Sequence, residues 1–482
     1  MNLRIVLHLI SHMLMVIGCG LASSWGVSRY YGDPLLAELS LGYSSLITLV
    51  SAFALKIFTR GNTELTRRDG FGIVTLGWLA ASAFGALPFV LSGVIPSPIS
   101  AFFETMSGFT TTGASVINAL EGVPRGILFW RATTHFFGGM GVLVLCIAIL
   151  PFLGVGGMQI FRAEMPGPSK DRLTPRIANT AKLLWGVYVL LTILEILLLR
   201  VGKMPWFDAT CHAFATMATG GFSTRTASIA AYNSPYIEAV IVVFMVLAGV
   251  NFALHYRALR GDIGSYFHDP EFRTYILIWA GSALFISLNL CSTGCASLRH
   301  ALRIGFFQTT SIMTTTGFVT ADFDQWPAVS KFVLILLMFV GGCSGSTGGG
   351  IKIVRIHVVF KAIVREIRLF MQPMAVLRVK LGQQLLEQDI VSNITAFFVI
   401  FIFVFISATT TMCFFTPDFQ TAASSVAATL GNIGPGFGVV GPMVTYSSIP
   451  AAGKAILAFC MLLGRLELYT VLVLFLPSIW RK

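Results

Sequence analysis

The stretch TTTGASV at residues 110–116 returns as TTTGFVT at residues 314–320, about 200 residues later. Each copy follows a short apolar stretch and precedes a long hydrophobic segment. Two copies of one threonine-rich turn in equivalent surroundings indicate an internal repeat, and such repeats determine how a whole chain is organised. The hydrophobic neighbours of both copies place the repeat in a membrane.

The composition supports a membrane protein. Of the 482 residues 55% are hydrophobic and only 11% are charged, and the mean hydropathy is +0.80, whereas soluble domains carry about 25% charged residues. Apolar runs long enough to cross roughly 30 Å of hydrocarbon lie at about residues 4–28, 36–58, 71–93, 126–153, 183–199, 236–258, 274–291, 330–356, 391–415 and 452–477. The sequence therefore predicts an all-α membrane protein with about ten transmembrane helices.

The basic residues indicate the orientation of these helices. The net charge is +12, and Lys and Arg gather in the loops that face the cytoplasm of a multi-pass protein. Alternate loops hold most of them, and Arg200, Lys203 and Arg299 are exceptions: Lys56, Arg60, Arg67 and Arg68; Arg162, Lys170, Arg172, Arg176 and Lys182; Arg257, Arg260 and Arg273; Lys361, Arg365, Arg368, Arg378 and Lys380; Arg481 and Lys482. We expect both termini in the cytoplasm, and no nucleic-acid partner.

Two further copies of the turn complete a fourfold repeat. They read ATGGFST at 218–224 and GNIGPGFG at 431–438, so the repeated glycines are Gly113, Gly221, Gly317 and Gly434, at intervals of 108, 96 and 117 residues. Upstream positions also match. Twelve residues before the glycine stand Ala101, Ala209, Gly305 and Ala422, four before it Phe109, Met217, Met313 and Leu430, and nine before it the polar Glu104, His212, Gln308 and Ser425.

Each repeat predicts a re-entrant helix. Only about 10 to 14 residues precede each glycine in helical pattern, which is too short to cross a bilayer. Irregular backbone at membrane depth is tolerated only inside protein or beside a watery cavity. We expect four re-entrant pore helices and four pseudo-repeats around one pore, with two N-terminal transmembrane helices in 1–69 and repeats at 70–177, 178–268, 269–388 and 389–482.

A threonine-rich turn that ends in glycine suits a dehydrated cation. Backbone carbonyls and hydroxyls replace the ion's water, glycine adopts the unusual dihedral angles, and the negative end of each short helix points at the ion. The candidate filter residues are Thr111, Thr112, Gly113, Thr219, Gly220, Gly221, Thr315, Thr316, Gly317, Asn432, Ile433 and Gly434. One such turn alone is typical of close packing, but four at a common period favour a filter. The second and fourth copies lack the threonine run, so cation passage is a firmer expectation than strict selectivity.

Several longer motifs extend the comparison to the whole chain. They are RDGF at 68–71, FGGMG at 137–141, GGMQIFRAEMPGP at 156–168, GGCSGSTGGGIK at 341–352 and GRLE at 464–467. With the four turns, the chain resembles the Trk/Ktr family of bacterial potassium transporters, most closely its TrkH/TrkG branch. The resemblance implies a K⁺ pathway of four pseudo-repeats, homodimers in the bacterial inner membrane, and regulation by a cytosolic ring of TrkA-type nucleotide-binding subunits.

The stretch GGCSGSTGGGIK lies inside a predicted span. Six of the ten residues from 341 to 350 are glycine, and each costs a helix about 1 kcal/mol relative to alanine. The phosphate-loop pattern fails because no Ser or Thr follows Lys352, and close helix packing is the alternative. The resemblance implies an intramembrane loop below the filter, with Gly345, Gly348, Gly349 and Gly350 as gate residues.

Arg465 also lies inside an apolar span, where an uncompensated charge is costly and faces a cavity or a partner. Glu467, two positions on, does not share its helical face. The resemblance implies that Arg465 faces the pore below the filter and contacts the glycine-rich loop, so we assign it to the gate. Pairing with the carbonyl groups of a neighbouring helix is the alternative.

The remaining polar residues carry smaller expectations. The pore-helix residues Glu104, His212, Gln308 and Ser425 are expected to hydrogen-bond the filter backbone. Glu195 is expected to reach the membrane interface, with a proton-coupling site as the alternative. Cys291 and Cys295 could form a disulfide. No clustered His, Asp or Glu suggests an enzyme, and an organic-solute symporter would show inverted repeats. We predict K⁺ uptake with K⁺ as the transported ion and no bound cofactor; the alternative is a proton- or sodium-coupled cation symporter of the same fold with weaker K⁺ selectivity.

Overall fold

The structure is a computed structural model that describes residues 1–59, 66–148, 173–382 and 384–480. Among these residues the regular secondary structure is helical apart from one hairpin of two-residue strands, β1 (Lys380–Leu381) and β2 (Gln384–Leu385), and loops connect the helices. The predicted all-α class is therefore confirmed. Cys291 and Cys295 are both free thiols.

The long helices follow the predicted spans except for α16, which lies mostly in a segment that the sequence analysis assigned to a loop. They are α1 (Leu3–Tyr31), α2 (Leu35–Phe58), α3 (Arg67–Gly85), α6 (Arg125–Ala148), α8 (Leu173–Val201), α10 (Pro235–Ala248), α13 (Pro270–Ser292), α15 (Ala328–Val340), α16 (Ile353–Met371), α17 (Gln388–Met412) and α19 (Ala451–Arg465). Shorter pieces include α4 (Leu87–Leu91), α11 (Phe252–Leu259), α12 (Gly264–His268), α20 (Tyr469–Leu472), η6 (Val473–Phe475) and α21 (Pro477–Trp480).

Three of the ten predicted spans are interrupted. Among the described residues six helices are long and apolar enough to cross a membrane, and two bent pairs raise that number to eight. The predicted span 236–258 bends by 102° between α10 and α11, and the span 452–477 bends by 112° after α19. The span 330–356 stops at Val340, where Gly341 takes a φ of 74°. Part of the span 126–153 and the motif at 156–168 lie outside the described residues.

Each interruption has a local cause. Asn251 caps α11 with its side chain, which accepts a hydrogen bond from the Ala253 N–H and so starts a new helix. At the other bend Glu467 and Leu468 have φ values of 59° and 45°, a left-handed conformation that ends a helix. Hydropathy depends only on composition and does not detect a helix cap or a positive φ. The prediction from hydropathy therefore gave continuous spans.

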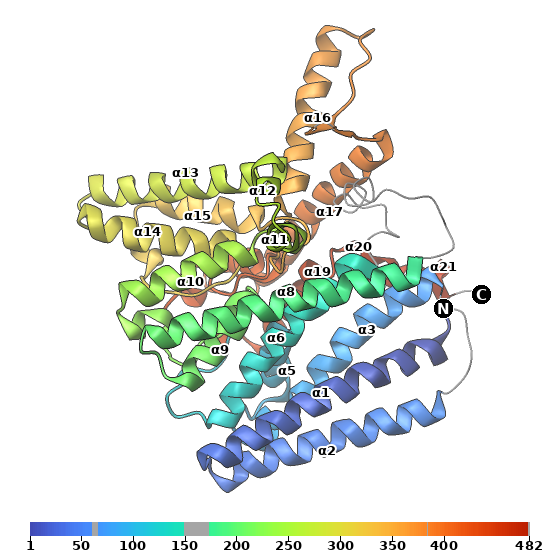
Figure 1. The fold of residues 1–482 in the computed structure, drawn as a ribbon, viewed down its shortest axis with the longest axis vertical. Coiled ribbons are helices and arrows are strands. Elements are labelled where there is room, and N and C mark those ends of the chain that lie inside the picture. The colour runs from blue at the N-terminus through green and yellow to red at the C-terminus, as the bar shows by residue number, and fades with distance from the viewer. Residues whose placement is uncertain (60–65, 149–172, 383, 481–482) are drawn as a thin grey trace.

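The N-terminal pair α1 and α2 lies at one edge of the bundle, and both chain ends lie at the same end of the molecule (Figure 1). The two helices pack closely because Gly18 carries no side chain where Leu49 approaches, and the Ser45 hydroxyl donates to the Gly18 carbonyl at 2.9 Å. The outer face of α2 exposes Leu46, Val50 and Phe53. An apolar face of this kind suits lipid rather than water.

Four short helices stand where the re-entrant helices were expected. They are α5 (Pro98–Phe109), α9 (Trp206–Met217), α14 (Leu298–Met313) and α18 (Phe419–Leu430). Three have 12 residues and α14 has 16, so one is longer than predicted but still short of a full crossing. Each ends four residues before its repeated glycine, and the repeat is therefore a structural one.

The expectation for Glu195 is wrong. Its side chain is 0% exposed, and neither carboxylate oxygen has a hydrogen-bond partner among the described residues. The reason is the length of α8, which continues six residues beyond Glu195 to Val201 and packs against α9. Glu195 therefore lies inside the bundle and not at its edge.

Candidate ion-conduction site

The four loops after the short helices share one backbone conformation. Gly113, Gly221, Gly317 and Gly434 have φ values of 81°, 75°, 82° and 103°, and the residues two positions earlier, Thr111, Thr219, Thr315 and Asn432, have values of 52°, 54°, 61° and 55°. A residue other than glycine in this region costs on the order of 1–3 kcal/mol. The four loops have similar, unusual φ values, including the two loops whose sequences differ. They therefore have one common backbone structure.

The loops close into a ring. A Cβ on Gly113 would overlap the Gly220 carbonyl oxygen, one on Gly221 that of Thr316, and one on Gly317 that of Ile433. The ring closes at Gly434, where a Cβ would lie 2.7 Å from the carbonyl oxygen of Thr112. In each case the neighbour supplies the carbonyl of the residue before its own glycine. The ring order therefore follows the chain order, and only glycine fits at the contacts.

One small cavity of about 110 Å³ reaches all four glycines from the outside. Polar residues from the first two repeats line its wall, among them Ser115, Asn118, Arg131 and Thr226. Nearby, Thr226 donates hydrogen bonds to Glu121 through its N–H at 2.9 Å and its hydroxyl at 2.5 Å. These bonds lower the pKa of the Glu121 carboxyl, so it stays negative at the mouth.

The predicted filter residues that precede these glycines are buried. Thr111, Thr112, Thr219, Thr315, Thr316, Asn432 and Ile433 are all 0% exposed. In the first and third loops the outer threonines brace each other, through Thr110–Thr112 and Thr314–Thr316 contacts of 2.8 Å between hydroxyls. The fourth loop instead uses Asn432, whose amide donates to the Thr112 hydroxyl at 3.0 Å and to the Met461 carbonyl at 2.9 Å.

Polar residues in two of the four short helices bind backbone three residues beyond the repeated glycine, whereas the sequence predicted contacts with the filter backbone itself. The Glu104 carboxylate accepts from the Val116 N–H at 2.8 Å, and the side-chain oxygen of Gln308, in the orientation that satisfies its amide, accepts from the Thr320 N–H at 2.7 Å. His212 contacts the Ser223 hydroxyl at 3.0 Å and, within its own helix, the Asp208 carbonyl at 2.7 Å. The expectation fails for Ser425, which bonds within its own helix.

The sequence reasoning missed Arg131. This buried residue of α6 pairs with Glu104 at 2.6 Å, donates to the Ser223 carbonyl at 2.9 Å and lies 3.6 Å from the centre of the Phe222 ring. It therefore ties the first short helix to the second loop. The available signal was a single arginine within the apolar run 126–153, where an uncompensated charge is costly.

The glycine-rich stretch 341–352 lies directly below three of the loops. The Thr347 hydroxyl donates to the Met217 carbonyl at 3.0 Å, and the Gly349 N–H donates to the Thr315 hydroxyl at 2.8 Å. A Cβ on Gly349 would also overlap the carbonyl oxygen of Gly431. The second, third and fourth short helices thus all end against this stretch. The predicted unwinding is present, with φ near 74° at Gly341, Gly345 and Gly350 and 76° at Lys352.

The predicted gate residues occupy different places in this stretch. Gly348 lies below the third loop, since a Cβ there would be 3.3 Å from the Thr314 carbonyl oxygen. Gly350 packs against Gly341, at the base of the stretch. Gly345 faces Asn251, and its carbonyl accepts from the Phe252 N–H at 3.1 Å. The structure therefore brings Gly348 and Gly349 to the loops and keeps Gly345 at the α10–α11 break.

Arg465 reaches the stretch that the sequence predicted, but it does so at Thr347 and not at Gly345. Its guanidinium donates to the Thr347 carbonyl at 2.7 Å and to the Gly138 carbonyl of α6 at 3.3 Å. The side chain is buried, with 4% exposed. The sequence analysis offered two contacts for Arg465, the glycine-rich stretch and the carbonyl groups of a neighbouring helix. Arg465 makes both. Thr347, which the sequence analysis did not single out, is the shared contact.

Two carboxylates anchor the ends of the stretch. Glu271 of α13 accepts from the Ser344 N–H at 2.6 Å and from the Val354 N–H at 3.2 Å. Glu467 forms ion pairs with Lys352 at 3.0 Å and with Arg355. Glu467 therefore pairs with α16 and leaves Arg465 to the carbonyls above. The glycine-rich stretch is fixed at both ends while its middle, Thr347 to Gly349, lies under the ring.

Comparison with known proteins agrees with this architecture. A protein-family model described as TrkH, cation transport protein, matches residues 43–482. The chain belongs to the TrkH family. It is 40% identical over the full length of both chains to the Trk system potassium uptake protein TrkH of Halomonas elongata, and 44% identical to that of Salmonella typhimurium over 88% of each chain.

More distant members and a solved structure place the chain in the same family. The TrkG protein of Escherichia coli K12 is 34% identical and covers 100% of this chain and 99% of its own. The crystal structure of the potassium transporter TrkH from Vibrio parahaemolyticus covers 100% of both chains with a TM-score of 0.92 at 36% identity. The family is one of transporters, so this chain is a multi-pass membrane transport protein and not an enzyme.

The Glu104–Arg131 pair yields a stability prediction. We expect Arg131→Met to lower the free energy of unfolding in detergent by about 3–5 kcal/mol, because it leaves the Glu104 carboxylate buried without its cation. Adding Glu104→Gln to Arg131→Met is expected to restore part of the loss. If the double variant is less stable than Arg131→Met alone, the pair is not the source of the loss.

Proposed function

We propose that this protein takes up potassium ions across a bacterial inner membrane through a channel-like pore, whose selective section is the ring of loops 111–113, 219–221, 315–317 and 432–434. The observation that carries the proposal is the closed ring of four glycines. A ring of backbone oxygen atoms from four segments is how selective cation pores replace the hydration shell of an ion. The names of the relatives, all potassium uptake proteins, support K⁺ as the ion.

The chemistry of the ring requires no bound cofactor. Carbonyl dipoles carry partial negative charge, and the C-terminal ends of α5, α9, α14 and α18 add theirs at the same place. The Thr111 hydroxyl and the Asn432 side-chain oxygen have no hydrogen-bond partner among the described residues. Both are therefore available to a partly dehydrated cation or its water, and K⁺ is the transported ion.

The gate in this proposal is the pair formed by the glycine-rich stretch and Arg465. Thr347 and Gly349 contact the ends of three short helices from below, so the stretch lies across the path of an ion leaving the ring. Arg465 holds Thr347 in place and adds a positive charge that repels cations. Opening requires the stretch to move, and glycine gives it a backbone that moves at low cost.

We also propose a homodimer and a cytosolic TrkA-type nucleotide-binding ring as partners. The support is membership of a family whose relatives are named as parts of a Trk system and the shape of the cytosolic end. Figure 1 shows α16 projecting out of the bundle, and Lys361, Arg365 and Arg368 follow one another at helical spacing along it. Residues spaced in this way share one face, which suits an acidic partner surface.

A second candidate function keeps the same fold but couples cation flux to protons or sodium. The observation in its favour is Glu195, a fully buried carboxyl without a hydrogen-bond partner among the described residues. An ionisable residue inside a membrane bundle is costly and marks functional sites. Glu195 lies on α8, the helix that packs against the second short helix.

The pore prediction concerns Gly317. We expect wild-type protein in proteoliposomes to pass K⁺ well ahead of Na⁺ and Gly317→Ser to reduce that preference about tenfold, a change of roughly 1.4 kcal/mol. The reason is that a Cβ at this left-handed position overlaps the Ile433 carbonyl oxygen. The control is Gly122→Ser, since that glycine meets no atom within 4 Å. A folded Gly317→Ser protein with wild-type preference would contradict the filter.

The gate prediction concerns Arg465. Arg465→Ala is expected to raise K⁺ flux roughly tenfold, because it removes a charge worth several kcal/mol at membrane depth and frees the Thr347 carbonyl. Arg260→Ala is the control, because Arg260 stacks on Tyr256 outside the site. Flux is measured as K⁺-gradient-driven ⁸⁶Rb⁺ exchange in proteoliposomes. Unchanged flux in a folded Arg465→Ala protein would exclude this residue from the gate.

A further inference from the structure

The fourth loop lacks the internal brace of its counterparts. The first and third loops are closed by hydroxyl pairs, whereas the equivalent residues of the fourth are Gly431, Asn432 and Ile433. Pro435 follows its repeated glycine, and the segment 434–441 contains four glycines. Glycine-rich backbone has many accessible conformations and little intrinsic order. The contacts that hold segment 434–441 must therefore come from other parts of the protein.

Part of the support comes from the same repeat. The Ser424 hydroxyl of α18 accepts from the Phe437 N–H at 2.9 Å and donates to the Phe437 carbonyl at 3.2 Å. The Val439 N–H donates to the Thr421 hydroxyl at 3.3 Å. Tyr446 donates its buried hydroxyl to the carbonyl of Gly434 at 2.7 Å. Between these contacts lies Gly438, whose φ of 68° is accessible to glycine but rare for other residues.

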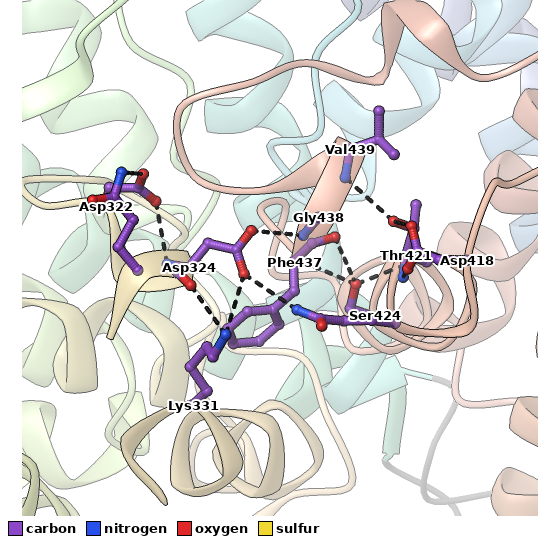
Figure 2. A network of polar contacts seen from close by, with 11 residues as sticks. Asp322, Asp324, Lys331, Asp418, Thr421, Ser424, Phe437, Gly438 and Val439 are labelled. Atoms are coloured by element: carbon purple, nitrogen blue, oxygen red, sulfur yellow. Dashed lines mark hydrogen bonds and ion pairs between the residues drawn. The ribbon is translucent and has the colours of Figure 1, made fainter. Parts of the chain in front are cut away.

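Asp324 supports Gly438 from the neighbouring repeat. It lies in the 3₁₀ turn η3 (Phe323–Gln325), after the third loop, and its carboxylate accepts from the Gly438 N–H at 3.0 Å. Figure 2 shows this carboxylate between Lys331 on one side and Gly438 on the other. Its second oxygen accepts from the Gln420 amide of α18 at 3.2 Å and lies 4.0 Å from the Lys331 ammonium.

The turn that carries Asp324 is itself fixed. Phe323 is 0% exposed, and its ring contacts that of Phe437 edge to face at 5.2 Å. Phe323 and Asp324 thus contact two successive residues of the fourth repeat. Phe323 packs against Phe437, and Asp324 accepts a hydrogen bond from Gly438. Beyond them the Gly436 N–H donates to the Val440 carbonyl at 2.7 Å and closes a tight turn. A shift of Gly438 would be transmitted through this turn to Gly434.

We propose that Asp324 is a positioning residue for ion selectivity: it fixes segment 434–441 through the Gly438 N–H and so holds the fourth loop in the ring. The inference rests on the proposed potassium pathway and adds a residue from outside the four loops. Asp324 does not bind the ion, because Gly438, Gln420 and Lys331 already occupy its oxygen atoms. The fourth loop therefore depends in part on a contact between the third and fourth repeats that lies outside the four loops.

The test uses three variants in proteoliposomes, with the ratio of K⁺ to Na⁺ flux as the readout. Asp324→Ala removes the acceptor, and we expect the ratio to fall roughly three- to tenfold, as for loss of a hydrogen bond to a charged group. Asp324→Asn keeps an acceptor oxygen for the Gly438 N–H and is expected to stay near the wild-type ratio. The thermal midpoint of each variant in detergent reports whether it is folded.

The control for charge is Glu121→Ala. Glu121 carries the same charge at the mouth, but its carboxylate accepts from Thr226 of the second repeat. The wild-type ratio is therefore expected for this variant. An equal loss in Glu121→Ala and Asp324→Ala would mean that negative charge at the mouth matters and not the contact with Gly438, which overturns the proposal.

The remaining outcomes also decide. If Asp324→Asn loses as much preference as Asp324→Ala, the charge and not the hydrogen bond is responsible, and the proposal is wrong. If folded Asp324→Ala keeps the wild-type ratio, Asp324 has no role in selectivity. A wild-type protein without K⁺ preference would instead contradict the proposed function, so the two failures are distinguishable.

Discussion

The close approach of carbonyl oxygen atoms to four glycines is the constraint on which the rest of the structure depends. At Gly113, Gly221 and Gly317 a single Cβ would overlap the neighbouring loop, and all four glycines have a left-handed φ. The ring therefore exists only if four loops arrive at one point with the same distorted backbone. Such distortions persist only where the surroundings over-determine them, and the polar contacts around the ring supply that support.

The supporting contacts differ from repeat to repeat although the backbone does not. Threonine pairs brace the first and third loops, and Asn432 links the fourth to the first. Glu104 and Arg131 tie the first repeat to the second. Because the side chains differ and the ring geometry is constant, the backbone and not any one side chain is the shared structural element. This agrees with a pore in which carbonyl groups contact the ion.

Backbone contacts also hold the glycine-rich stretch below the ring. The glycine-rich stretch is fixed by carboxylates at its two ends, Glu271 and Glu467, while its middle touches the short helices. A segment that is held at both ends and has two glycines, Gly348 and Gly349, in its middle can change its backbone conformation without unfolding its neighbours. Arg465 contacts that middle through one carbonyl, a bond that a small movement would break.

The sequence by itself determined the class of the protein and the place of its repeats. Hydropathy depends on composition, and backbone sterics require the glycines at 113, 221, 317 and 434. The hydropathy pattern and the repeated glycines can therefore both be recognised in the sequence. Ten apolar segments, three of which the structure interrupts, the four short helices and the glycine-rich stretch at 341–352 followed from these local signals. Local signals do not report which distant groups meet.

The tertiary structure decided which distant residues contact each other. Arg465 bonds to Thr347 and not at Gly345, Glu467 pairs with Lys352 and Arg355, and Asp324 reaches Gly438 across 114 residues. Glu195 is buried because α8 continues past it, and two predicted spans bend because a cap or a left-handed residue ends a helix. Each of these facts depends on how helices far apart in the chain pack, and hydrogen bonds between such helices leave no periodic trace in the sequence.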